Sequence, residues 1–350
     1  MVKVLNKKPR KKKYSPKQQK ENRTLFVSAP LIIAPKYVDY LSTRFDSSNL
    51  KFLNELKQAL SARDTIYLSF RGTKSLKATA LLVIYSIIDT YGKNKTINII
   101  WSDISKVVNA SIKTSGSFKS VEHRQNILNE KKGLPVIQGN NAEVIQLQKK
   151  IIDTLIELYL DKEDPNFVDR RFEIGTAIQE TLDNVGRHAY PNSEHSDKIW
   201  WFCCDIIEDK LFIVIYDSGI GIPNSILTSK IDYMKLIEQN YKNHEDLKNK
   251  FKNAPEPTVT AHLRETLSDE ALIRAAMSSD LSTTTKDKHG KGSSRIKALI
   301  KNEKESFLLI FSKQGIYQYS LYNENDDEKG EEVLSRLQHT LDGTLIQWSL

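Results

Sequence analysis

The sequence predicts an α/β protein of the α+β type, in which a small α/β domain precedes a second domain of helices and strands. Three observations predict this class. Strand and helix patterns alternate over residues 25–120, helical patterns fill residues 143–190, and strand patterns dominate residues 199–216 and 307–350. Alternation is typical of parallel strands, whereas strands in succession favour hairpins. A chain of 350 residues is long enough for two cores.

The first domain contains a strand–helix–strand pattern. Residues 65–70 form a β-rich apolar run, residues 77–91 have apolar side chains at helical spacing, and residues 96–101 form a second β-rich run. A βαβ unit of this length predicts parallel strands. A further amphipathic segment, residues 104–112, follows the second run.

By this pattern, residues 24–120 resemble the STAS family, the sulfate-transporter and anti-sigma-factor-antagonist fold. Phosphorylatable members of that family carry an Asp-Ser-Ser-Gly-like turn that opens the helix. The matching stretch of this chain, residues 75–80, lacks both the acidic residue and the glycine. Ser75 and Thr79 are the candidate phosphate acceptors, but we expect Ser75 to cap the helix instead.

The middle of the chain, residues 121–164, is predicted to be a connector with a long helix. Residues 121–140 are polar and contain Gly133 and Pro135, whereas residues 143–160 carry a wide apolar stripe. A stripe of this width must pack on something, either the two domains or a second copy of itself.

The second domain, residues 165–350, is predicted to begin with a helix that follows Asp164-Pro165 and stops at Pro191. Strands come next, with hairpin turns expected at Asp209 and Gly315. The predicted strands cover residues 199–207, 210–216, 307–311, 316–321 and 343–350.

The net charge of +8 is concentrated at the N-terminus. Residues 1–23 hold ten Lys or Arg and one Glu, so the remaining chain has a net charge of about −1. With Pro9, Pro16 and almost no apolar content, this basic arm is predicted to be disordered and solvated. The alternative is that the arm binds phosphates, on nucleic acid or on another acidic surface.

Other features of the composition favour the cytoplasm. No stretch approaches the roughly 18 apolar residues of a membrane helix, and no apolar segment typical of a signal peptide follows the first lysines. The two cysteines, Cys203 and Cys204, are adjacent in a strand pattern, so their side chains point to opposite faces. We therefore expect neither a disulfide nor a zinc site, which fits a reducing compartment.

The most informative residues lie on the predicted helix before Pro191. Glu180, Asn184 and His188 are four residues apart, so they share one face of a helix. A carboxylate, an amide oxygen and an imidazole in one row suit a magnesium–phosphate group with a water beside it. Simpler interpretations exist: Glu180 and Asn184 as solvent-facing polar residues, and His188 as a cation at the C-terminal end of the helix.

A second group of residues follows the apolar strand at residues 211–216. Asp217 ends this strand, and Gly219 and Gly221 allow the backbone to bend tightly and to approach a flat ring closely. Together with the row on the helix, these residues predict a nucleotide pocket. The simpler interpretation of Asp217 is a turn residue.

These segments, together with Gly290-Lys291-Gly292-Ser293-Ser294, match in order and spacing the three nucleotide boxes of the GHKL superfamily, which includes gyrase, the large heat-shock chaperone ATPases and the histidine kinases. We name them the first box (residues 180–190), the second box (217–222) and the third box (290–294). The resemblance covers residues 165–350 and implies the Bergerat fold, an α/β sandwich with a mixed sheet and helices on one face. The first box is most similar to that of the anti-sigma-factor serine kinases.

For the first box, the resemblance implies three roles. Glu180 is the catalytic residue that orients or deprotonates the attacking water. Asn184 is the magnesium ligand, with its side-chain oxygen facing the phosphates. His188 contacts a phosphate.

For the second box and the last strand, the resemblance implies recognition of adenine. Asp217 accepts a hydrogen bond from the adenine amino group, while Gly219 and Gly221 admit the ring. Thr344, in the closing Gly343-Thr344 pair, holds a water that bridges to Asp217.

For the third box, the resemblance implies a loop that wraps the phosphates through Gly290, Lys291, Gly292 and Ser293. Ser294 stands where a further glycine is usual, and a helix follows whose positive end faces the phosphates. Residues 224–289, with helical patterns at 230–252 and 268–278, are an insertion that is expected to close as a lid.

The sequence therefore predicts a magnesium-dependent ATP-binding protein in which slow hydrolysis drives a lid switch that regulates an unidentified protein partner. ATP and Mg²⁺ are the expected cofactors. The alternative prediction is a serine/threonine protein kinase of the anti-sigma-factor type that acts on a STAS-like acceptor. Two further possibilities are left open: that the domain binds ATP without hydrolysing it, and that the protein forms a homodimer.

Overall fold

The computed structural model describes residues 29–41, 47–207, 210–228, 231–278, 292–300, 305–321 and 330–350. Its mixture of helices and separate sheets confirms the α+β class. The predicted basic arm, the turn at Asp209 and the box residues Gly290 and Lys291 lie outside the described residues. Among the helices that are described, none is long and apolar enough to cross a membrane.

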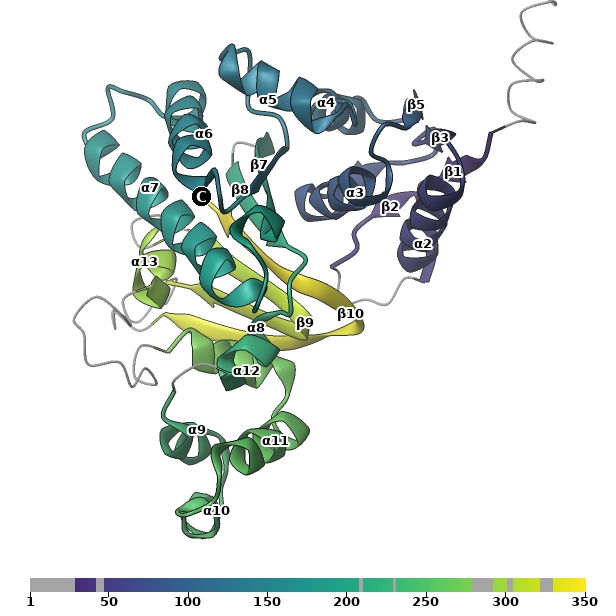
Figure 1. The fold of residues 1–350 in the computed structure, drawn as a ribbon. Helices are drawn as coiled ribbons and strands as arrows, with labels where there is room; N and C mark the ends of the chain where they lie inside the picture. Colours follow the sequence, from purple (N-terminus) through teal and green to yellow (C-terminus); the bar gives the residue numbers. More distant parts are fainter. Residues whose placement is uncertain are drawn as a thin grey trace, which may run out of the picture.

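The first domain contains a three-stranded parallel sheet in the order β1-β3-β5 (Figure 1). Its strands are β1 (Leu31–Ile33), β3 (Thr65–Ser69) and β5 (Thr96–Ile100). Helix α3 (Ala78–Tyr91) connects β3 to β5, so the predicted βαβ unit is confirmed. Helices α2 (Ser47–Ala62) and α4 (Lys106–Thr114) complete this domain.

The predicted cap of α3 is wrong. Ser75 lies in β4 (Ser75–Leu76), a short strand that pairs with β2 (Tyr37–Val38). The residue before the helix is Lys77, whose extended backbone leads into α3 without a side-chain hydrogen bond. Thr79 is buried in the first turn of the helix. The STAS-like resemblance of this domain stays a prediction.

The second domain is built on a five-stranded sheet in the order β6-β7-β8-β10-β9. Its strands are β6 (Ile137–Asn140), β7 (Ile199–Ile207), β8 (Lys210–Asp217), β9 (Phe307–Ser320) and β10 (Glu331–Ser349). Every described pairing in this sheet is antiparallel, so the predicted mixed sheet is wrong. The reason is the strand order, because β10 enters between β8 and β9 and runs opposite to both.

The predicted hairpin at Gly315 is also wrong. Strand β9 runs through this residue, and Gly315 pairs with Arg336 of β10. A Cβ atom at Gly315 would lie 2.6 Å from the backbone nitrogen of Glu270 in helix α12 (Asp269–Ala276). Glycine is therefore needed here for the close approach of a helix and not for a turn.

Three helices cover one face of the five-stranded sheet (Figure 1): α6 (Val144–Tyr159), α7 (Phe167–Asn184) and α13 (Gly292–Ala298). Both long helices predicted before Pro191 are thus confirmed. The apolar stripe of α6 packs into this core through Leu147, Ile151 and Leu155. The segment before α6 is more than a connector, because it contains α5 (Val121–Asn129) and the edge strand β6.

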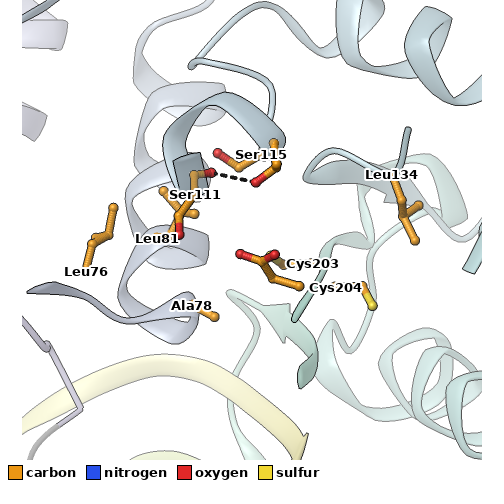
Figure 2. A pocket seen from close by; sticks show the side chains of 10 residues that line it. Leu76, Ala78, Leu81, Ser111, Ser115, Leu134, Cys203 and Cys204 are labelled. Atoms are coloured by element: carbon orange, nitrogen blue, oxygen red, sulfur yellow. Dashed lines mark hydrogen bonds between the residues drawn. The ribbon is translucent and has the colours of Figure 1, made fainter. Parts of the chain in front are cut away.

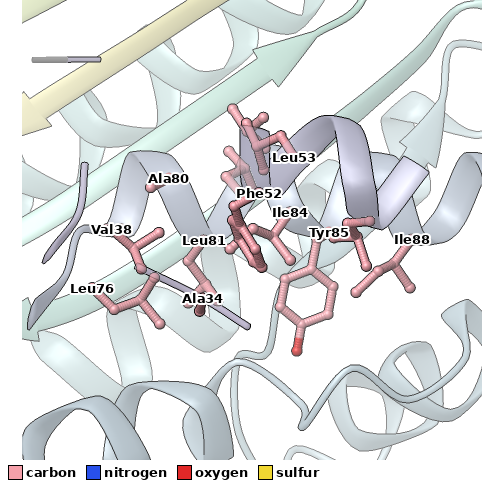
Figure 3. Close-up of a cluster of buried hydrophobic side chains, with 14 of the residues drawn as sticks. Ala34, Val38, Phe52, Leu53, Leu76, Ala80, Leu81, Ile84, Tyr85 and Ile88 are labelled. Carbon is pink, nitrogen blue, oxygen red and sulfur yellow. The ribbon is translucent and has the colours of Figure 1, made fainter. Parts of the chain in front are cut away.

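Helix α3 lies between the parallel and the antiparallel sheet (Figure 1). Its sequence is apolar all round, which is typical of a helix that is buried on every side. Figure 3 shows the part of this core in which Phe52 of α2 packs near Leu81 and Ile84 of α3. Trp201 and Tyr216 of the antiparallel sheet belong to the same core, so the two domains share it.

A buried ion pair also joins the two domains. Arg124 of α5 donates from Nη2 to Oδ2 of Asp89 in α3 (2.6 Å), and the indole Nε1 of Trp201 in β7 donates to the same oxygen (3.0 Å). Burial raises the pKa of Asp89, and the charge of Arg124 opposes this effect. One carboxylate thus links three elements of two domains.

The predicted lid insertion folds in its described part as a helical lobe. Its helices are α8 (Ile222–Ser225), α9 (Tyr233–Asn240), α10 (His244–Phe251), α11 (Glu256–Thr266) and α12. The lobe has a core of its own, which includes Leu236, Phe251, Leu263 and Leu272. The lobe extends away from the sheet in Figure 1. Helix α12 packs against the edge strand β9 and so connects the lobe to the sheet. The rest of the predicted lid, residues 279–289, lies outside the described residues.

Candidate functional site

The first and second boxes meet at the ends of α7 and β8. The backbone N–H of Ile220 donates to the carbonyl oxygen of Ala189 (2.8 Å). The hydroxyl of Tyr190 accepts from the N–H of Ser218 (3.0 Å) and donates to the carbonyl of Ile199 (2.6 Å). Segments about thirty residues apart in the chain are therefore joined by one backbone hydrogen bond and by the hydroxyl of Tyr190.

Asp217 and Thr344 are neighbours in the antiparallel sheet. They pair across β8 and β10, and the N–H of Thr344 donates to the carboxyl group of Asp217. The N–H of Gly219 donates to Oδ1 of Asp217 (2.9 Å). Burial raises the pKa of Asp217 to about 7, against the opposing effects of these two N–H groups and of the positive charge of Lys313. The residue is thus a buried acid that titrates near neutral pH.

Ser312 is a member of this site that the sequence did not reveal. Its hydroxyl, fully buried, accepts from the N–H of Ile222 (2.9 Å), donates to the carbonyl of Gly343 (2.8 Å) and lies 3.0 Å from Oγ1 of Thr344. The second box and the closing Gly-Thr pair are therefore held together by one side chain. The available signal was a serine directly after the predicted strand at residues 307–311.

The glycines of the site serve the packing of the chain. Gly221 and Gly343 have φ angles of +83° and +81°, which side chains rarely adopt. A Cβ atom at Gly343 would lie 1.9 Å from the carbonyl oxygen of Asp217, and one at Gly219 would lie 2.2 Å from that of Ala189. The Cβ sides of Gly219 and Gly221 face protein atoms. That the two glycines admit a flat ring stays a prediction.

The first box does not form a single α-helical face. Helix α7 ends at Asn184, and residues Val185–Ala189 continue as a π-helix, so His188 lies on a different kind of helical turn from Glu180 and Asn184. Segments of π-helix inside helices are frequent at functional sites. No described residue forms a hydrogen bond with the side-chain amide of Asn184, which is half-buried.

His188 lies at the surface of the π-helical turn. Partial desolvation lowers its pKa, and the charge of the neighbouring Arg187 lowers it further. The ring is therefore neutral near pH 7, which argues against the interpretation of His188 as a cation at a helix end. A neutral imidazole retains one N–H donor for a ligand.

Glu180 connects the first box to the third. Its side chain is 14% exposed and accepts a hydrogen bond at Oε1 from Nη1 of Arg295 in α13. Oε2 lies 3.9 Å from Nη2 of Arg187, and a Cβ atom at Gly292 would lie 3.1 Å from it. The half-buried Ser293 follows Gly292 in the first turn of α13. The first described residue of the third box, Gly292, thus lies next to the carboxylate of Glu180, the predicted catalytic residue.

A cleft of about 190 Å³ lies on the other side of the second box, between the two domains. Its lining includes Ser218, Trp201 and Asp342 from the antiparallel sheet and Lys57 and Tyr91 from the first domain. Ser218 is held in place by the hydroxyl of Tyr190. Burial, with the nearby charge of Asp217, raises the pKa of Tyr190 to about 12, so this hydroxyl stays protonated near neutral pH.

A second, much smaller cavity of about 10 Å³ lies where Leu81 and Ser115 of the first domain face the thiols of β7 (Figure 2). This volume is about that of one water. Cys203 and Cys204 are both free and buried, and burial raises the pKa of each thiol. Protonated, inaccessible thiols are poor nucleophiles, so neither cysteine is a candidate nucleophile.

The donor set of the first box suits magnesium. Among the described residues, no group of three His, Cys, Asp or Glu side chains forms a metal cluster. Asn184 offers an amide oxygen that has no partner among the described residues. Mg²⁺ takes few protein ligands because it keeps waters and phosphate oxygens. A single half-buried oxygen donor therefore fits a magnesium–phosphate group better than it fits a bare ion.

No family model matches the chain, and no curated protein matches it.

Proposed function

We propose that this chain is a magnesium-dependent ATP-binding protein of the GHKL type, which hydrolyses ATP slowly and thereby regulates a partner. One observation carries the proposal: the first box contacts the second box at the end of β8 and the described part of the third box at the start of α13, although the three lie far apart in the sequence. A buried carboxyl group with a raised pKa inside such a meeting point is typical of a functional site.

Adenine recognition would fall to Asp217. Its carboxyl group is already fixed by the N–H groups of Gly219 and Thr344, so an acceptor oxygen is preorganised for an amino group. Because the pKa is about 7, the fully ionised acceptor forms above neutral pH. Binding of adenine nucleotides should therefore strengthen as the pH rises through this value.

The phosphates would lie toward Asn184 and the start of α13. Magnesium, held by Asn184, would neutralise the phosphate oxygens and orient the terminal phosphate. Arg295 and neutral His188 would supply donors to these oxygens.

Hydrolysis requires Glu180 to be released from Arg295. In the described structure this carboxylate pairs with Arg295 and lies 3.9 Å from Nη2 of Arg187, so both of its oxygens face guanidinium groups and not a water. A terminal phosphate competes for Arg295, which frees Glu180 to take a proton from the attacking water. The water oxygen then forms a bond to the terminal phosphorus while the bond to the bridging oxygen breaks, giving ADP and phosphate. Because Glu180 must first be released, turnover would be slow.

Incubation with ATP labelled on its terminal phosphate tests the proposal. We expect labelled free phosphate from the wild type, and binding without turnover from Glu180→Ala. Asn184→Ala should weaken binding with magnesium and leave binding in excess chelator unchanged. Label on the protein itself would instead support the alternative prediction, a serine/threonine kinase. Unchanged turnover in Glu180→Ala would remove this residue from its role.

A further inference from the structure

The carboxyl ends of the three parallel strands form a second surface with a distinct character. The loops after β1, β3 and β5 are joined: Oγ1 of Thr73 donates to the carbonyl of Pro35 (2.9 Å), and Oγ of Ser102 donates to the carbonyl of Thr73 (2.8 Å). The N–H of Lys74 donates to the carbonyl of Lys36 (2.7 Å). We call this surface, residues 35–37, 71–77 and 101–107, the carboxyl edge. In open α/β sheets, ligands bind at the carboxyl ends of strands.

The carboxyl edge is basic. Its exposed cations are Lys36, Arg71, Lys74, Lys77 and Lys106. Lys113 of α4, also exposed, lies nearby. Within the defined edge, the one acidic side chain is Asp103, which pairs with Arg71 (3.3 Å). The charge asymmetry extends beyond the edge, because residues 24–120 hold 13 Lys or Arg and 6 Asp or Glu, whereas residues 121–350 hold 29 and 37. This asymmetry is typical of chains that bind a polyanion with one half.

Two aromatic rings stand among these cations. Tyr37 is 50% exposed and Trp101 is 36% exposed. Nζ of Lys36 lies 5.6 Å from the centroid of the Tyr37 ring, and Nζ of Lys113 lies 5.6 Å from that of Trp101. Each ring therefore has an ammonium group beside it, at the end of a different strand.

The loop after β3, the strand between the two that precede the rings, is open at Gly72. A Cβ atom at Gly72, between Arg71 and Thr73, would meet no atom within 4 Å. The residues that follow Trp101 add exposed apolar side chains, Ile104 and Val107. A phosphate could thus approach the backbone at Gly72, beside Arg71, without displacing protein atoms.

We propose that the carboxyl edge binds single-stranded nucleic acid. Phosphates would contact Lys36, Arg71 and Lys74, and unpaired bases would stack on Tyr37 and Trp101. Cations that follow a backbone, combined with aromatic rings for bases, are the common device for this ligand. Duplexes hide the faces of their bases, so the rings favour single strands. The surface is separate from the ATP site, and the inference does not depend on the proposed function.

Fluorescence anisotropy with the full-length chain tests this proposal. The probes are labelled oligonucleotides of about 16 residues, as single-stranded DNA, single-stranded RNA and duplex DNA of one sequence. Trp101→Ala should weaken single-strand binding by roughly five- to a hundred-fold, and Trp101→Phe should recover most of it. Lys74→Gln should reduce the slope of log affinity against log salt by about one. Lys93→Gln, an exposed lysine away from the edge, is the matched control.

The outcomes show whether the carboxyl edge or the basic arm binds the oligonucleotide. A preference for DNA or for RNA identifies the ligand and supports the proposal in either case. If Trp101→Ala and Lys74→Gln leave binding unchanged while Gln at Lys11, Lys12 and Lys13 removes it, the arm is the binding element and the proposal is wrong. Equal affinity for duplex and single strands, or no binding at low salt, also overturns it.

Discussion

The two sheets of this protein carry their charges at strand ends in opposite ways. At the end of β8, one carboxyl group is buried and held by neighbouring N–H groups. At the ends of β1, β3 and β5, the charges are cationic and exposed. Burying a charge costs stability, whereas exposing one costs almost nothing. A single buried acid is therefore informative by itself, while exposed cations gain meaning only as a pattern with aromatic rings.

The largest expected effect concerns the buried pair that joins the domains. Asp89→Ala leaves the Arg124 guanidinium buried without its partner, and we expect a loss of about 3–5 kcal/mol in the free energy of unfolding. Asp103→Ala, which breaks the exposed pair with Arg71, is the matched control and should cost less than about 1 kcal/mol. Urea denaturation measures both. Similar losses in the two variants would contradict the contrast between buried and exposed charge.

Glycine substitutions at the two kinds of strand end should differ almost as much. Gly343→Ala places a Cβ atom 1.9 Å from the carbonyl oxygen of Asp217 at a φ of +81°, and we expect it to cost about 2–4 kcal/mol. Gly72→Ala meets no atom within 4 Å and should change stability by less than about 1 kcal/mol. Thermal and urea unfolding would measure the difference. A tolerated Gly343→Ala would show that the second box is less tightly packed than described.

The pH dependence of stability isolates the buried acid. Burial raises the pKa of Asp217 to about 7, above the value of about 3.9 in the unfolded chain. The folded state therefore holds its proton more tightly, so this residue's contribution to the unfolding free energy is present at low pH and is lost as the pH rises toward about 7. The Asp217→Asn variant has no ionisable group at this position, so its unfolding free energy does not decrease for this reason as the pH rises.

The stability difference between Asp217→Asn and the wild type should thus grow in favour of the variant between about pH 4 and pH 7, reaching roughly 1–4 kcal/mol. Urea unfolding at a series of pH values measures it, and other titrating groups cancel in the difference. Asp205→Asn, at the far end of β7, should show the same trend to a smaller extent, because burial also raises the pKa of this half-buried acid. A constant difference between Asp217→Asn and the wild type would refute the raised pKa.

The smallest effect on stability, and a specific one on binding, is expected from Arg295→Gln. Its ion pair with Glu180 is half-exposed on the arginine side, so the loss should be under about 1 kcal/mol. Binding of ATP should weaken while binding of ADP, which lacks the terminal phosphate, stays unchanged. Lys297→Gln on the same helix removes a comparable pair with Glu332 (3.1 Å) and should affect neither nucleotide. An equal loss for ATP and ADP would remove Arg295 from contact with the terminal phosphate.

Local patterns in the sequence predict much of this fold. The βαβ unit around α3 and the long helices α6 and α7 follow from apolar periodicity alone. Gly315 shows the limit, because a glycine between two β-rich runs is typical of a turn until the helix α12 that packs on it is known. The antiparallel order of the sheet likewise depends on where β10 enters, which no local pattern records.

The residues of the candidate site likewise fall into two groups, those that the sequence predicts and those that it does not. Asp217 and Thr344 are apparent as motif residues, and the structure makes them neighbours. Ser312 and the pairing of Glu180 with Arg295 could not be predicted, since they arise from contacts between segments far apart in the chain. The π-helical turn at His188 was also missed, because a spacing of four residues suits both kinds of helix until the hydrogen bonds are known.

Equilibrium binding of Mg·ATP, followed by titration calorimetry on the wild type, Asp217→Asn and Asp205→Asn, tests the meeting of the three boxes most directly. We predict saturable binding by the wild type and the Asp205→Asn control, stronger at pH 8 than at pH 6, and a loss of at least tenfold in Asp217→Asn, about 1.4 kcal/mol or more. No heat from the wild type, or equal affinity in all three proteins, would contradict an ATP site at this place.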